Sequence, residues 1–95
     1  MVALLLSACG PLPELICTYD SIETCERAAS AALDAVGDRS GVTMVTIKPP
    51  DGTWRREGAR YLALAMVHRA DGGVTLFRVS QTDDQPMRAE IIATE

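Results

Sequence analysis

Apolar residues recur at steps of three and four between Ser21 and Val36, which is the spacing of a single helix face. The stripe consists of Ile22, Cys25, Ala28, Ala29, Ala32, Leu33 and Val36. Asp20 and Glu23 have the spacing of a capping box at its start, and Gly37 is a typical stop at its end. The sequence therefore predicts a helix from Ser21 to Val36, and its many alanines allow it to pack closely on the rest of the domain.

Beyond Gly41 the pattern changes to that of strands. Four segments rich in β-branched and apolar residues are separated by turn sequences; they are Val42–Lys48, Tyr61–Arg69, Val74–Gln81 and Met87–Ala93. Residues 16–19 could add a short edge strand. We predict an α+β fold in which one N-terminal helix packs on one face of a three- or four-stranded antiparallel β-meander.

The turn between the two longest strands determines which side chains face the helix. A two-residue turn at Asp71-Gly72, or one at Gly72-Gly73, predicts an antiparallel pair. Both registers bring five large apolar residues onto one face, namely Leu62, Leu64, Met66, Phe77 and Val79. We expect this face to lie beneath the helix.

The reverse face of the sheet is also apolar in this register, where a solvated sheet is normally polar. It carries Tyr61, Ala63, Ala65, Val67 and Leu76. Because one helix covers only one face, we expect a protein partner, a second copy or the membrane surface to cover the other, with Tyr61, Ala65 and Val67 as candidate contacts. The alternative is that the N-terminal segment covers it.

The composition narrows the function classes. The chain has 95 residues, 47% of them hydrophobic, and a net charge of −4. This length is that of one domain, and the negative charge argues against nucleic acid, which requires a concentrated basic surface. No apolar run reaches the ~18–20 residues that span a bilayer.

Candidate chemistry is sparse. His68 is the only histidine, and without a cluster of Cys, Asp or Glu it makes no metal site. The sequence contains no nucleophile elbow, phosphate-binding glycine loop or paired carboxylate motif. We therefore expect no enzyme activity, no metal and no cofactor.

The longest connection between the strands contains Trp54, Arg55 and Arg56. Trp and Arg are enriched at binding hot spots, and loops on rigid scaffolds often carry function. These three residues are candidates for contacting a partner. Alternatively, Trp54 folds back over the open edge of a small core while the arginines remain solvated.

Near the N-terminus, an apolar run ends in Leu6-Ser7-Ala8-Cys9, followed by Gly10. This motif resembles the lipobox of bacterial lipoproteins. The resemblance implies that residues 1–8 are the remnant of a signal peptide truncated at its start, and that Cys9 is lipidated and begins the mature chain. Residues 9–19 would then form a tether, and residues 20–95 a single domain not assigned to a family. The protein would be exported and anchored on the outer side of the cytoplasmic membrane or in the periplasm.

The two remaining cysteines are Cys17 and Cys25. Export would permit a disulfide between them, and small exported domains often depend on such bonds. The alternative is two reduced cysteines, one of them packed in the core.

The function predicted from these observations is that of a small lipid-anchored envelope protein, a binding or accessory module for another envelope protein. The membrane contact would be made through the lipid, and a partner or a second copy would meet the outer sheet face. The alternative is a carrier of a small apolar or lipid ligand between helix and sheet, which requires an open cavity.

Overall fold

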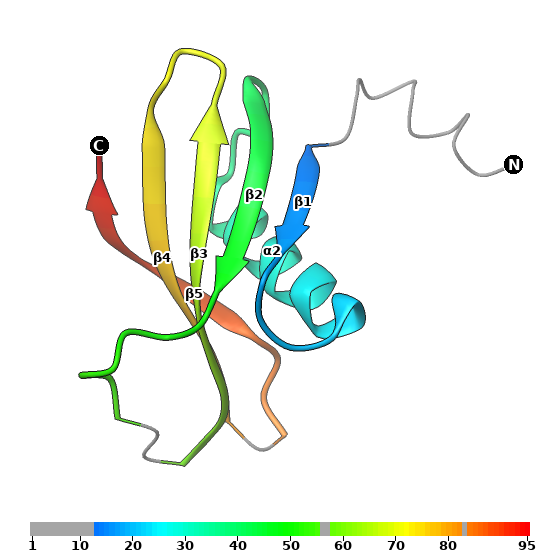
Figure 1. The fold of residues 1–95 in the computed structure, drawn as a ribbon, viewed down its shortest axis with the longest axis vertical. Helices are drawn as coiled ribbons and strands as arrows, with labels where there is room; N and C mark the ends of the chain where they lie inside the picture. The colour runs from blue at the N-terminus through cyan, green and yellow to red at the C-terminus, as the bar shows by residue number, and fades with distance from the viewer. Residues whose placement is uncertain (1–12, 56–57, 83) are drawn as a thin grey trace, which may run out of the picture.

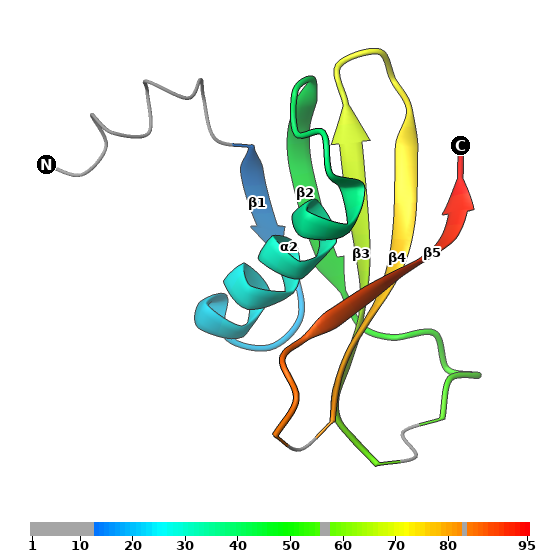
Figure 2. The ribbon, with the colours of Figure 1, turned by 180° about the vertical axis from the view of Figure 1, so that it is seen from behind.

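The computed structural model describes residues 13–55, 58–82 and 84–95. Its elements follow in the order β1 (Glu14–Cys17), α2 (Ile22–Val36), β2 (Val42–Lys48), β3 (Ala59–Arg69), β4 (Val74–Thr82) and β5 (Arg88–Thr94). The strands form one sheet in the order β1-β2-β3-β4-β5. Figure 1 shows this sheet in front of α2, and Figure 2 shows from behind that α2 crosses one of its faces.

The sheet is mixed, because β1 pairs with β2 in parallel while the other neighbouring strands are antiparallel. The prediction of a three- or four-stranded antiparallel meander is therefore wrong, although β2 to β5 do follow one another as a meander. The strand β1 begins two residues before the predicted edge strand. It lies within the segment expected to be a tether and has only four residues, too few for a strand period to stand out beside Pro11 and Pro13.

The helix begins one residue later than the capping-box pattern predicts. Ser21 is the N-cap, and its hydroxyl oxygen accepts a hydrogen bond of 3.2 Å from the Thr24 backbone N–H. Asp20 instead has a positive φ of 72° and accepts from the Ser21 N–H at 2.8 Å. The predicted end is confirmed, since Gly37 has a φ of 82° and donates its N–H to Leu33 O at 3.2 Å.

The hairpin between β3 and β4 has a three-residue loop, Ala70-Asp71-Gly72, instead of the predicted two-residue turn. The Gly72 N–H donates to Arg69 O at 2.9 Å, and the Arg69 N–H donates to Gly73 O at 2.9 Å. Gly72 has a φ of 93°, as expected for a turn followed by a left-handed residue. This loop pairs Ala65 with Phe77, and the one-residue difference in register exchanges the two faces of β3.

The core therefore contains the opposite side of β3 from the one predicted. The side chains of Ala63, Ala65 and Val67 are fully buried in the cluster that packs against α2, and Tyr61 is only 6% exposed. The helix contributes small residues to the same cluster, including the fully buried Ala28 and Ala32. Alanines on both elements allow close contact, so Tyr61, Ala65 and Val67 do not form the exposed binding face expected for them.

Tyr61 brings a polar atom into this core. Its hydroxyl is buried and has no hydrogen-bond partner among the described residues. Burial, and then the nearby Asp20 carboxylate, raise the pKa of Tyr61 from 10.0 to about 12. The neutral phenol is thus the form that the folded state accommodates.

We predict that Tyr61→Phe alters the stability at alkaline pH. Because the pKa of Tyr61 is raised in the folded state, ionisation of its phenol opposes folding, and stability is lost as the pH rises above about 10 towards about 12. Urea unfolding from pH 8 upwards should therefore show a steeper loss for the original chain than for Tyr61→Phe. At pH 7 the variant should gain roughly 1 kcal/mol, because an unpaired buried hydroxyl is removed. Parallel pH profiles would contradict this prediction, and Tyr19→Phe is the control.

Candidate functional site

The face of the sheet that α2 leaves uncovered, here called the outer face, is the candidate site. On β2, β3 and β4, the residues between those of the core cluster point towards it, because successive side chains of a strand alternate. Four of them are large, apolar and only half-buried, and we call them the apolar patch: Met44, Leu64, Met66 and Leu76. On β3, Met66 lies two positions from Leu64 and pairs with Leu76 on β4. Met44 lies on the neighbouring strand β2, opposite His68, which is two positions from Met66.

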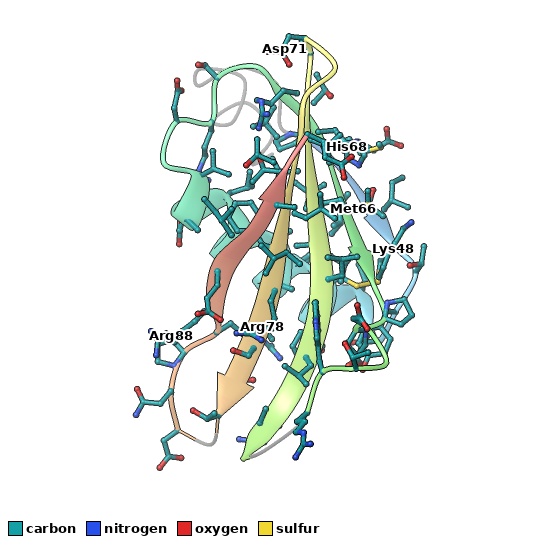
Figure 3. The ribbon with its side chains drawn as sticks, turned by 90° about the vertical axis from the view of Figure 1, so that its left-hand side faces the viewer. Lys48, Met66, His68, Asp71, Arg78 and Arg88 are labelled. Carbon is teal, nitrogen blue, oxygen red and sulfur yellow. A yellow bond between two sulfur atoms is a disulfide. The ribbon has the colours of Figure 1, made fainter. Side chains whose placement is uncertain are left out.

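Figure 3 views the sheet from the side of β4 and β5: Met66, His68 and Lys48 lie on the right, on the side of the sheet away from α2, Arg78 lies lower on β4, and Arg88 lies at the lower left. His68 is half-buried, and its Nε2 lies 3.3 Å from Thr46 Oγ1. Within residues 13–55, 58–82 and 84–95, no three His, Cys, Asp or Glu side chains are grouped so that they could hold a metal ion. The arrangement of His68 therefore offers a local hydrogen bond at a strand end.

A row of charged residues borders the apolar patch. Lys48 pairs across the sheet with Leu64, Leu64 with Arg78, and Arg78 with Glu90. The Arg78 guanidinium donates from Nη2 to Glu90 Oε1 at 2.6 Å, and this bond together with the positive charge lowers the pKa of Glu90.

Two further cations of the sheet, on β2 and β5, form no such ion pair with a described residue. Lys48 and Arg88 are exposed, and neither forms an ion pair with any residue that the structure describes. Lys48 pairs with Leu64 and leaves a positive charge beside the apolar patch, whereas Arg88 pairs with Ser80 at the start of β5, where its charge also lowers the pKa of Glu90. The face therefore combines half-exposed apolar side chains with a cation able to meet an acidic surface.

The loop that contains Trp54 lies at the same face. The Trp54 side chain is half-buried, and the Arg78 Cζ atom lies 6.0 Å from the centroid of its ring, within the range of a cation–π contact. The loop is shaped by a turn at Asp51, whose carboxylate accepts 2.8 Å hydrogen bonds from the backbone N–H and the hydroxyl of Thr53. These bonds lower the pKa of Asp51.

The structure places only some of the predicted site residues at the outer face. Trp54 and the exposed Arg55 lie beside the outer face, where Arg55 lines a hollow together with Leu62 and Arg78. Arg56 and the lipobox cysteine, Cys9, lie outside the described residues. The residues that sequence reasoning missed are Met44, the cations Lys48 and Arg78, and Leu64 and Met66, which the incorrect register placed under the helix.

The predicted disulfide between Cys17 and Cys25 is confirmed. Their Sγ atoms are 2.08 Å apart and their Cα atoms 5.9 Å apart. The bond joins the end of β1 to the second turn of α2, away from the outer face. Its role is to hold the edge strand against the helix.

Comparisons with known proteins assign this chain to no family. No protein-family model matches the chain, and neither a curated protein nor a solved structure matches it. The helix that the structure describes is too short and too polar to cross a membrane.

Proposed function

We propose that this chain is a small lipid-anchored envelope protein that binds another envelope protein through the outer face of its sheet. The observation that carries the proposal is the apolar patch of Met44, Leu64, Met66 and Leu76, which α2 does not cover and which Lys48 borders. The matching partner surface is apolar at its centre and acidic at its rim.

The proposed location is the outer side of the cytoplasmic membrane or the periplasm. It is supported by the resemblance of Leu6-Ser7-Ala8-Cys9 to a lipobox and by the disulfide between Cys17 and Cys25. Disulfides persist in oxidising compartments and are rare in the cytosol. Lipidation at Cys9 would keep the domain close to the membrane and raise the local concentration of membrane-held partners.

A protein partner fits the outer face better than the other function classes. Catalysis requires converging acid, base or nucleophilic groups, and the described part of this face offers His68 with a threonine neighbour. The carrier of an apolar ligand fits less well, because the space between α2 and the central strands is occupied by fully buried side chains such as Phe77 and Ile47.

Site-specific photocrosslinking in the native host tests the docking surface. A benzoylphenylalanine at position 66 should give a discrete protein adduct, and the same probe at position 35, an exposed site on α2, should not. Lys48→Glu should reduce the adduct at least about fivefold, since the charge beside the patch is reversed. Adducts with phospholipid alone, with a second copy alone, or equally from both positions would contradict the proposal.

A Cys9→Ser variant tests the anchor separately. The original chain should be recovered from membranes, cleaved before Cys9 and carrying added acyl mass. The Cys9→Ser variant should lack the acyl mass and leave the membrane fraction. An unmodified chain in the cytosol would contradict the proposed location.

A further inference from the structure

A groove opens at the β1 edge of the sheet, between α2 and β1. It has a volume of about 220 Å³, and its apolar lining includes Leu15, Ala29, Leu33 and Val45. Sites for small molecules usually enclose roughly 300–1,000 Å³. This groove is therefore of a size for one or two side chains of a larger ligand.

The groove runs beside an edge of the sheet at which a further strand can pair. The strand β1 is the first in the sheet order, and no described segment pairs with its outer edge. The backbone N–H of Thr18 donates to Ile47 O at 3.0 Å, and backbone groups alternate in direction along a strand. The N–H and C=O groups of Leu15 and Cys17 therefore point to the open edge.

Two carboxylates border this groove and edge. Glu14 and Glu26 are exposed, line the groove, and form no ion pair with a described residue. The only cation in the described lining, Arg39, already has Asp34 as a partner at 2.5 Å. The rim thus has unbalanced negative charge, which selects for a basic ligand.

We propose that this edge is a peptide-binding site in which an extended segment pairs with β1 and places one apolar side chain in the groove. Backbone hydrogen bonds to the edge require an extended chain, and the groove, which accepts one side chain of that segment, provides the specificity. The unpaired carboxylates of Glu14 and Glu26 select a segment with Lys or Arg next to the apolar residue. The site is separate from the outer face and does not depend on the function proposed above.

The disulfide gives this site its rigidity. The bond between Cys17 and Cys25 fixes β1, which forms one wall of the groove, to α2, which forms the other. A preformed groove lowers the ordering cost that a short peptide must overcome on binding.

Selection from a library of displayed random heptapeptides, with the full chain as bait, tests the proposal. The recovered peptides should share a central Leu, Ile, Val or Phe with Lys or Arg beside it. Ser30 is exposed and lines the groove, so Ser30→Trp should weaken the best synthetic peptide at least about tenfold by filling the groove. The control is Ala35→Trp, another exposed position of α2 outside the groove lining, which should leave the affinity unchanged.

Backbone pairing is tested on the same synthetic peptide. N-methylation of alternate amides on one side of the peptide should abolish binding, and N-methylation on the other side should leave it intact, because only one side faces β1. Glu26→Lys should weaken a basic peptide, and peptides without Lys or Arg should be insensitive to this change.

Three results would overturn the proposal. The first is that no peptide is enriched. The second is binding that Ser30→Trp does not weaken, which would place the peptide elsewhere, for example on the opposite edge strand β5. The third is self-association of the chain that Ser30→Trp abolishes, since a second copy would then occupy the groove.

Discussion

Ala65→Lys is expected to remove most of the stability of this protein, by more than about 4 kcal/mol. Ala65 is fully buried and lies between Ile47 and Phe77 in the sheet, beneath α2. A lysine there has neither space nor an opposite charge, and its ammonium group must either lose its proton or push the helix away. Because small domains have only about 5–15 kcal/mol in total, urea unfolding should show a partly or wholly unfolded chain.

The matched control is Met66→Lys, one residue further along β3. Met66 is half-buried and points to the outer face, where the long side chain of lysine can reach solvent. Its cost should stay below about 1 kcal/mol, as for most substitutions outside the core. If Met66→Lys were the more destabilising of the two, the faces of β3 would be those of the two-residue turn, and the outer face described above would be wrong.

This pair of variants concerns the point at which the sequence was ambiguous. The strand β3 is apolar on both sides, so its period of two does not show which side is buried. Only the turn fixes the register, and Asp71-Gly72-Gly73 is compatible with loops of two or three residues. A usable signal was present, because His68 shares a face with Leu64 and Met66, and polar residues mark the solvated side of a sheet.

Other elements could be predicted because their signals are local. The helix was found from its apolar spacing and from Gly37, and β2 to β5 were found from β-branched and apolar segments between turns. The strand β1 could not be placed in the same way. Its pairing with β2 is parallel and depends on α2 leading the chain back across the sheet, which is a tertiary effect that four residues do not encode.

The candidate site could likewise be predicted only where its signals are local. The sequence identified Trp54 and Arg55 by residue type, and it indicated that one sheet face would remain uncovered and apolar. It did not identify Lys48 and Arg78 as neighbours of one patch, because they belong to different strands and both lie opposite Leu64 only once the register is known.

Removing the disulfide with Cys17→Ala and Cys25→Ala is expected to lower the free energy of unfolding by about 2.5 kcal/mol, the value that chain entropy gives for so short a loop. The two cysteines are separated by 8 positions. The chain without this disulfide should still fold, since the cluster beneath α2 is centred on β2, β3 and β4. Urea unfolding of both chains under identical conditions measures the difference.

The loss should be concentrated at β1. This strand is held by pairing with β2 on one side and by the disulfide to α2, so the double variant should let β1 open without unfolding the rest. In native-state hydrogen exchange, the Thr18 amide, which donates to Ile47 O, should exchange faster by a larger factor than the Phe77 amide in β4. The control is Val79→Ala, which removes fully buried apolar atoms at a cost of about 1–3 kcal/mol without releasing β1. Equal acceleration at Thr18 and Phe77 in the disulfide variant would contradict this prediction, because the bond would then stabilise the whole domain uniformly instead of holding its edge strand.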